Sequence, residues 1–322
     1  MKNVNIAILG LGNIGTGVYK ALAMNGAHIA STTGLDITVA KIFEKDTDRD
    51  RGIDVAPSLF TQDEGDIFGD PAIDIVVELI GGVDFATSLM FKAVAAGKHV
   101  VTANKAALAA NFEQLTGTAE GAGVMLRYEA SVGGGIPIIG PLTTSLLANR
   151  YEELMGILNG TTNYILTKMT QEGRPYGEVL QEAQAKGFAE ADPSGDVEGE
   201  DLANKLSILM SLVFGKRVLP SDIPTTGITG ITMDDIRDAE KADCVIKLVA
   251  SAFRQGDGAE CFIQPVLLNK GHPLASVNDE YNALYIKGNA VDDLMFYGKG
   301  AGPLPTASAV LGDVIEIGRA IG

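Results

Sequence analysis

The feature that most limits the possible folds lies at the start of the chain, where a short apolar run opens into a glycine motif. Residues 4–9 have the pattern of a buried strand, and Gly10-Leu11-Gly12-Asn13-Ile14-Gly15 follows directly. The residues after Gly15 have helical spacing. A strand, a G-x-G-x-x-G turn and a helix in this order are typical of a dinucleotide-binding unit.

The glycines of this motif have separate tasks in such a unit. Gly10 allows the tight turn, Gly12 lets the backbone approach a pyrophosphate, and Gly15 lets the helix lie close to the strand. Backbone N–H groups at the helix start, beginning at Asn13 and Ile14, would face the anion. We therefore expect cofactor contacts along residues 10–15, while a purely structural glycine turn is the alternative.

The first part of the chain alternates strands and helices. Strands are expected at residues 37–43, 73–79, 99–102 and 124–128, and helices at 87–96 and 111–122. This alternation predicts an α/β fold, a Rossmann doubly wound parallel sheet. Lys105 follows one of these strands, at the sheet edge where ligands gather.

The end of the second strand bears on the choice of cofactor. An acidic residue there would bind the ribose 2′-hydroxyl, whereas a cation would accept a 2′-phosphate. The sequence has both, Glu44 and then Lys45, with Arg49 and Arg51 behind. The positive charges favour NADP slightly over NAD, although solvated surface charge explains them equally well.

The second part of the chain predicts a different architecture. Three glycines and a proline within residues 129–137 shape the backbone or form a linker. Helical patterns precede four strands at 244–254, 261–269, 281–288 and 294–299, which predict an α+β domain with a mostly antiparallel sheet. A glycine-proline segment then leads to a helix at 307–320. We expect a dinucleotide-binding domain of residues 1–128 plus about 302–322, and a catalytic, substrate-binding and dimerisation domain of residues 129–301.

An acidic stretch at residues 187–205 concentrates polar groups. Glu190 and Asp196 precede a helix that starts near Glu200, and on that helix Asp201 and Lys205 stand one turn apart. Several anionic oxygens and one ammonium could converge there on a small zwitterionic molecule. The alternative is a solvated acidic loop with a surface ion pair.

A strand at residues 153–158 ends before Asn159-Gly160-Thr161-Thr162. Thr161 or Thr162 could cap the following helix, whose N-terminus is a good seat for a carboxylate.

Composition excludes several classes of protein. The 322 residues are 46% apolar, 20% charged and carry a formal net charge of −16, which disfavours partners such as nucleic acid or anionic membranes. No signal peptide or membrane-spanning run is present, so a cytoplasmic location is expected. Cys244 and Cys261 lack metal-ligand spacing and are expected to be buried free thiols.

Taken together, the motifs resemble those of the homoserine dehydrogenase family over essentially the whole chain. The matching segments are GLGNIG, VVELIGG, TANKAALA, YEASVGGGIPII, GILNGTTNYIL, GFAEADPSGDVEGEDLANKLSIL and GKGAGPLPTASAVLGDV. The resemblance implies reversible NAD(P)H-dependent reduction of L-aspartate 4-semialdehyde to L-homoserine, on the route to threonine and methionine, by a homodimer. Many members continue into a regulatory ACT domain, whereas this sequence stops at Gly322, so feedback inhibition through such a domain is not expected.

The resemblance also implies roles for individual residues. It places Lys105 and Lys205 at the reacting centre and Gly300 in a segment that closes over the cofactor. The substrate-contacting positions that it implies are Gly160, Thr161, Glu190 and Asp201, with Asp196 close by. The ligands that it implies for a monovalent cation such as Na⁺ are Glu129, Val132, Gly134 and Ile136, mostly through carbonyls.

The chemistry needs a proton donor, because hydride delivery to an aldehyde leaves charge on oxygen. The three histidines, His28, His99 and His272, lie outside these motifs. We therefore expect Lys205 to transfer the proton and Lys105 to polarise the carbonyl, with the two ammonium groups close together. Two competing interpretations are an oxidoreductase for another amino acid or a sugar, and a non-catalytic nucleotide sensor.

Overall fold

The computed structural model describes residues 1–321, which form two compact units. Unit 1 contains residues 1–135 and the chain from Ala301 onward, and unit 2 contains Ile136–Gly300. The division falls after Gly135, whereas the sequence placed it after Tyr128. The reason lies in the turn Glu129–Ser131, which packs on the last helix and whose Glu129 N–H donates to Asp313 there at 2.8 Å.

Unit 1 is built on a six-stranded parallel sheet with the order β3-β2-β1-β4-β5-β6. The strands are β1 (Lys2–Leu9), β2 (Leu35–Phe43), β3 (Phe60–Thr61), β4 (Ile75–Glu78), β5 (His99–Thr102) and β6 (Leu126–Arg127). The helices are α1 (Asn13–Thr33), α2 (Gly65–Phe68), α3 (Asp84–Ala95), α4 (Lys105–Gly121) and α11 (Pro303–Ala320). The predicted doubly wound fold is confirmed.

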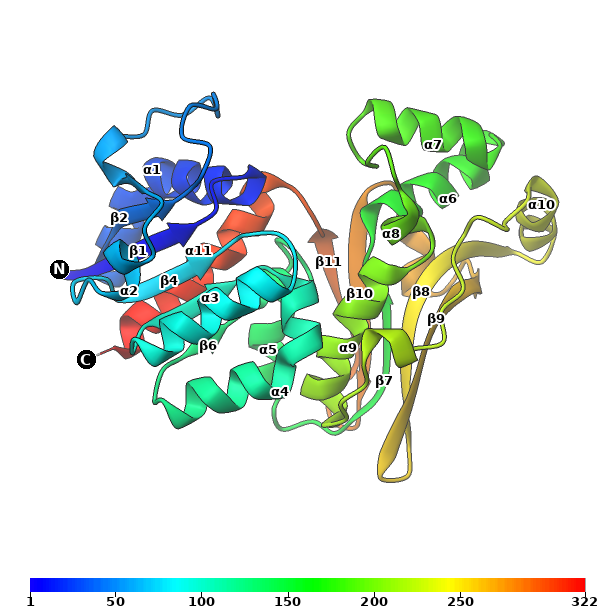
Figure 1. Cartoon of the computed structure of the whole chain (residues 1–322). Helices are drawn as coiled ribbons and strands as arrows, with labels where there is room; N and C mark the ends of the chain where they lie inside the picture. Colours follow the sequence, from blue (N-terminus) through cyan, green and yellow to red (C-terminus); the bar gives the residue numbers. More distant parts are fainter. Residues whose placement is uncertain (322) are drawn as a thin grey trace. The chain divides into compact units, whose positions relative to one another are not determined.

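The core of unit 1 surrounds its central strand β1. Val4, Ile6 and Ile8 have no exposed surface, as expected for a parallel strand covered on both faces. The last helix, α11, lies beside α1 (Figure 1), and it adds Val310 and Val314 to the same apolar cluster. The end of the chain therefore completes the core that its start begins.

Unit 2 is built on a five-stranded antiparallel sheet with the order β11-β10-β7-β8-β9. The strands are β7 (Tyr151–Ile157), β8 (Cys244–Gln255), β9 (Gly258–Asn269), β10 (Tyr281–Gly288) and β11 (Asp292–Lys299). The helices are α5 (Ile139–Thr143), α6 (Gly160–Glu172), α7 (Tyr176–Ala185), α8 (Ser194–Val197), α9 (Glu200–Phe214) and α10 (Met233–Lys241). The α+β architecture with an antiparallel sheet is confirmed.

Several predicted boundaries were wrong. The sequence pattern predicts a helix over residues 138–148, but α5 ends at Thr143, where the hydroxyls of Thr143 and Thr144 bond to backbone carbonyls one turn back and compete with the helix. The helix expected from residue 111 begins at Lys105 and bends at Asn111, which has non-helical angles. The last helix begins at Pro303 because proline suits the first helical position.

Cys244 and Cys261 are free thiols, but both are half-buried rather than buried. No helix within residues 1–321 combines the length and apolarity that crossing a membrane requires.

The contact between α1 and α11 gives a stability prediction. A Cβ at Gly17 would lie 2.4 Å from the Pro303 carbonyl oxygen, so Gly17→Ala forces the two helices apart. We expect a loss of about 1–3 kcal/mol, typical of overpacking, and a lower Tm in thermal unfolding. Gly26→Ala in the same helix is the control: a Cβ there meets no atom within 4 Å, so helix propensity should raise Tm slightly. Equal Tm values for the two variants would contradict this packing.

Candidate functional site

The glycine turn contains two glycines that the protein's own packing requires, Gly10 and Gly15, and one that it does not require, Gly12. A Cβ at Gly15 would lie 2.1 Å from the Gly10 carbonyl oxygen, and Gly10 itself has φ +91° with a Cβ position 3.0 Å from the Leu79 oxygen. A Cβ at Gly12, by contrast, would meet no atom within 4 Å. Because Gly12 is exposed at the N-cap of the 21-residue helix α1, close approach of an anionic group from outside explains a glycine there.

Glu44, at the end of β2, braces this turn. Its carboxylate accepts hydrogen bonds from Leu11 N at 2.8 Å and Asp46 N at 3.1 Å, and it lies 3.5 Å from the Arg51 guanidinium. Burial raises the pKa of Glu44, but these hydrogen bonds and the charge of Arg51 lower it below its ordinary value overall. Arg51 also donates to the Leu11 carbonyl at 2.7 Å. Lys45 is exposed, with its ammonium 5.6 Å from the Phe85 ring centre.

A buried acid organises the sheet edge from which Lys105 begins α4. Glu78 ends β4 and accepts hydrogen bonds from the Thr102 hydroxyl and from Ile80 N, both at 2.6 Å. The Thr102 oxygen in turn accepts Asn104 N at 2.9 Å, and Asn104 caps α4. Burial raises the pKa of Glu78 to about 7, although both hydrogen bonds oppose that shift. Lys105 is thereby placed at the carboxyl edge of the parallel sheet.

The segment predicted to hold a cation is divided between the units. Glu129, Val132 and Gly134 are buried residues of unit 1, whereas Ile136 belongs to unit 2. Burial raises the pKa of Asp313 to about 8, although its hydrogen bond from Glu129 N opposes this. Within residues 1–321 no three His, Cys, Asp or Glu side chains form a metal-binding group.

In unit 2, the one-turn spacing of Asp201 and Lys205 produces a buried ion pair. The Lys205 ammonium donates to Asp201 Oδ2 at 2.7 Å and to the Leu158 carbonyl at 2.5 Å. Lys205 is only 8% exposed, which is inconsistent with a solvated surface pair. Leu158 directly follows β7 and precedes α6, so the strand end, α6 and α9 meet at this ammonium.

Asn159 joins this pair to a second carboxylate, and sequence reasoning missed it. Asn159, not Thr161 or Thr162, caps α6: its Oδ1 accepts Thr162 N at 2.9 Å. Its Nδ2 donates to Asp196 Oδ1 at 2.7 Å and to Asp201 Oδ2 at 2.9 Å. The signal was an asparagine directly after a strand, a residue at least as good as threonine at an N-cap.

The remaining predicted substrate positions surround the start of α6. The Thr161 hydroxyl lies 3.0 Å from Asp196 Oδ2 and 2.6 Å from the Phe188 carbonyl. Glu190 is exposed on the segment that follows Phe188. Gly160 allows close packing, since a Cβ there would lie 2.9 Å from the Glu280 carbonyl oxygen.

The glycine at position 300 is required by packing within the protein itself. A Cβ there would lie 1.8 Å from Asn282 Nδ2, so packing in unit 2 already requires glycine at this position. A cofactor contact at Gly300 stays a prediction.

Two of the three histidines have structural partners. His99 Nδ1 accepts Met125 N at 2.9 Å, and burial lowers the pKa of His99, although the charge of Asp74 opposes this. His272 Nδ1 accepts Leu274 N at 3.1 Å and caps a short turn. These contacts fit the expectation that a lysine performs the acid-base step.

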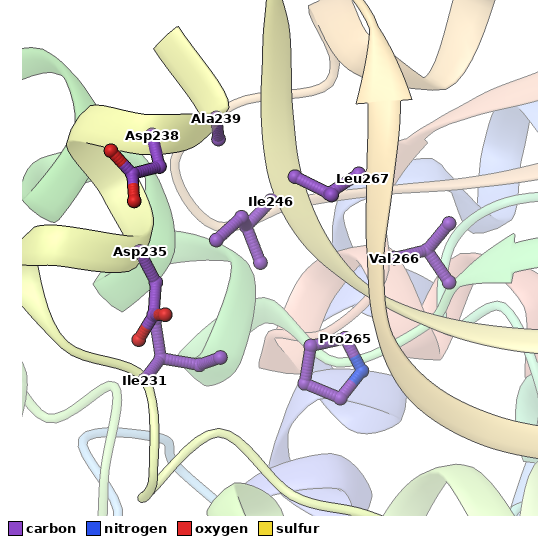
Figure 2. A pocket seen from close by; sticks show the side chains of 8 residues that line it. All are labelled: Ile231, Asp235, Asp238, Ala239, Ile246, Pro265, Val266 and Leu267. Atoms are coloured by element: carbon purple, nitrogen blue, oxygen red, sulfur yellow. The ribbon is translucent and has the colours of Figure 1, made fainter. Parts of the chain in front are cut away.

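A hollow between α10, β8 and β9 shares no residue with this polar cluster (Figure 2). Its lining is Ile231, Asp235, Asp238, Ala239, Ile246, Pro265, Val266 and Leu267. Both acids have partners, since Asp235 forms the capping box of α10 with Thr232 and Asp238 lies 2.7 Å from Lys241. The hollow therefore offers an apolar floor and no unpaired carboxylate.

Comparison with known proteins identifies the family. Residues 137–315 match the family model described as homoserine dehydrogenase, and residues 10–129 match that of the homoserine dehydrogenase NAD binding domain. Homoserine dehydrogenase of Bacillus subtilis is 42% identical over 317 residues, which cover 98% of this chain and 73% of the relative. The chain belongs to the homoserine dehydrogenase family. It is accordingly an NAD(P)-dependent oxidoreductase that interconverts L-aspartate 4-semialdehyde and L-homoserine in threonine and methionine biosynthesis, as its motifs indicated.

Solved structures of this family share the fold. A homoserine dehydrogenase from Thiobacillus denitrificans is 42% identical with a TM-score of 0.94, over 99% of this chain and 74% of that one. A hyperthermophilic archaeal homoserine dehydrogenase in complex with NADPH is 26% identical with a TM-score of 0.83, and 99% of each chain is covered.

The buried acid Glu78 gives a pH-dependent prediction. Its pKa of about 7 in the folded protein exceeds the ordinary 4.5, so the folded state holds its proton more tightly than the unfolded state. This contribution to stability is full below pH 4.5 and is lost as pH rises through 7, by about 3 kcal/mol at most. Glu78→Gln, which mimics the protonated acid, should therefore gain stability over the wild type between pH 5 and 8.

Thermal unfolding of both proteins across that pH range measures the effect. Glu120→Gln, which removes an exposed carboxyl of α4, is the control for the loss of one charge. If the difference in Tm between Glu78→Gln and the wild type did not change with pH, Glu78 would be ionised throughout this pH range.

Proposed function

We propose that Lys205 is the proton donor and acceptor of the homoserine dehydrogenase reaction. The supporting observation is that its ammonium is buried and held by hydrogen bonds to the Leu158 carbonyl and to Asp201. An acid-base group must be held within reach of the reacting oxygen, and these two contacts fix the side chain. Its place beside the N-terminus of α6 and the acidic segment suits a substrate that carries both an ammonium and a carboxylate.

The surrounding residues would orient the amino acid substrate. The N-terminus of α6, at Gly160 and Thr161, offers N–H groups suited to the substrate carboxylate. Glu190 and Asp201, with Asp196 nearby, supply the negative charge that attracts its ammonium. Glu190 is exposed and can meet a ligand, whereas Asp196 is fixed by Asn159 and Thr161.

The cofactor supplies or accepts the hydride when it is bound. The residues that would hold it are Gly10, Gly12, Asn13, Ile14 and Gly15, together with Lys45, Lys105 and Gly300. Lys105 would polarise the substrate carbonyl from the edge of the sheet in unit 1. Lys205 would then give its proton to the forming alkoxide, or take a proton from homoserine in the reverse direction. The approach of Lys105, in unit 1, to Lys205, in unit 2, stays a prediction.

Removal of the Lys205 ammonium tests this role. Lys205→Ala should lower kcat for homoserine oxidation by about 10²-fold or more, because an acid-base group is lost, while the KM of the cofactor changes little. Steady-state assays that follow the reduced cofactor spectrophotometrically measure both constants. Lys270→Ala removes an exposed lysine of unit 2 as the control. Unchanged turnover in Lys205→Ala would remove Lys205 from the acid-base role.

We infer a modest preference for NADP over NAD. The Glu44 carboxylate braces the glycine turn, and the neighbouring cation Lys45 is exposed beside it. An exposed ammonium at the end of β2 suits a 2′-phosphate. The related archaeal enzyme has been solved with NADPH, which supports the same direction.

Lys45→Ala should therefore raise the KM for NADPH about tenfold, the value of one charge-assisted hydrogen bond, and leave the KM for NADH unchanged. Lys41→Ala, within β2 and bonded to the Ser58 carbonyl, is the matched control. Measurements of kcat/KM with each cofactor decide the preference. A wild-type enzyme that strongly prefers NADH would show that the inference from Lys45 is wrong.

A monovalent cation such as Na⁺ would be held by oxygens of Glu129, Val132, Gly134 and Ile136. Buried backbone in this segment and the positive φ of Gly134 fit a set of carbonyl ligands.

We also expect a homodimer in the cytoplasm. Leu267 and Tyr297, on the two outer strands of the unit 2 sheet, are 61% and 52% exposed, which supports further association. The free thiols of Cys244 and Cys261 fit a reducing compartment.

A further inference from the structure

We propose that Asn159 is a positioning residue that sets the charge around Lys205, an inference that rests on the acid-base role proposed above. Asn159 is 5% exposed and uses both ends of its side chain. Its oxygen accepts the N–H and the hydroxyl of Thr162, at 2.9 and 3.0 Å. Its nitrogen donates to Asp196 and Asp201, at 2.7 and 2.9 Å.

Chemistry fixes the orientation of this amide. A backbone N–H can only donate, so the oxygen of Asn159 must face Thr162. Carboxylate oxygens accept hydrogen bonds, so the nitrogen faces Asp196 and Asp201. Asn159 therefore combines a helix cap with a bridge between two acids, and a cap alone would not require the bridge.

The bridge shares an oxygen with the proposed acid-base group. Asp201 Oδ2 accepts both the Asn159 amide and the Lys205 ammonium, which lie 2.9 and 2.7 Å from it. Asp196 accepts hydrogen bonds from Asn159 and from the Thr161 hydroxyl. Asn159 thus disperses the negative charge of Asp201 and, through the same amide, that of a second carboxylate, Asp196.

Other charged groups on the elements packed against α9 have different partners or face solvent. On β8, Lys247 and Arg254 donate to backbone carbonyls elsewhere in unit 2. Glu260 on β9 and Asp222 in the turn after α9 are exposed. Asp196, on α8, is therefore the acid that the amide can control together with Asp201.

Removal of the amide donor should concentrate negative charge on Lys205. The ammonium would then hold its proton more tightly, and homoserine oxidation, which needs the proton-free amine, would require higher pH. The consequence is a shift of the pH profile and a fall in kcat at neutral pH, with little change in cofactor binding.

Asn159→Asp removes the hydrogen-bond donor of this side chain and keeps its helix cap. Aspartate still accepts Thr162 N and caps α6, but it cannot donate to the two acids and adds a third negative charge. We expect the midpoint of the kcat–pH profile to rise by about one unit and kcat at pH 7.5 to fall about tenfold or more. The KM for the cofactor should stay within about twofold, because the change lies outside unit 1.

A second substitution tests the pairing directly. In Asn159→Asp combined with Asp196→Asn, the amide and one carboxylate exchange places and the net charge returns to that of the wild type. The double variant should recover part of the lost kcat and move the midpoint back, which is the coupling expected of residues in one network.

The matched control is Asn163→Asp, one turn further along α6. Asn163 is equally buried, and its amide donates to the carbonyls of Val277 and Tyr281 rather than to acids. It should lower Tm without moving the pH midpoint. If Asn159→Asp does not fold, Asn159→Ser, which keeps a cap and adds no charge, gives the same readout and should still raise the midpoint.

The outcomes separate the inference from the proposed function. A lower Tm with an unchanged pH midpoint in both Asn159 variants would show that Asn159 is a structural cap only. Full activity in Lys205→Ala would instead overturn the acid-base role itself, whatever the Asn159 variants do. Loss of activity in Lys205→Ala with a raised midpoint in Asn159→Asp would support both.

Discussion

The burial of one ammonium group is the constraint around which unit 2 is built. Removing Lys205 from water is costly, and two hydrogen bonds, to Asp201 and to the Leu158 carbonyl, offset that cost. A well-packed apolar side chain would serve stability at least as well. The pair therefore fits the acid-base role proposed above, and it requires β7, α6 and α9 to converge on one point.

The same local arrangement occurs in both units, with different chemistry at its centre. In unit 1, β5 ends at Thr102 and Asn104 caps α4, whose first residue is Lys105. In unit 2, β7 is followed by Asn159, which caps α6. Each asparagine accepts the helix N–H with its oxygen and uses its amide to fix a neighbouring loop or acid. A strand end and a capped helix thus position polar groups without flexible loops.

Sequence reasoning recovered what depends on local pattern. The alternation of strands and helices predicted both sheets, and the spacing of Asp201 and Lys205 predicted their contact, because i and i+4 residues share a helix face. Asn159 was missed because its partners Asp196 and Asp201 lie 37 and 42 residues away, and only the fold brings them together. Glu78 was quoted within a strand, but its raised pKa comes from complete burial, which sequence pattern alone does not show.

The glycines illustrate why motif and role must be separated. Gly12 and Gly300 were both predicted to contact the cofactor, and the sequence pattern alone does not distinguish their roles. At Gly300 the Asn282 side chain occupies the place of a Cβ, so the need for glycine is met within unit 2. At Gly12 no atom of the described residues, 1–321, lies within 4 Å of the Cβ position. A glycine that the protein itself does not require, at the N-terminus of a long helix, is the stronger sign of a bound anion, because the requirement must then come from the ligand.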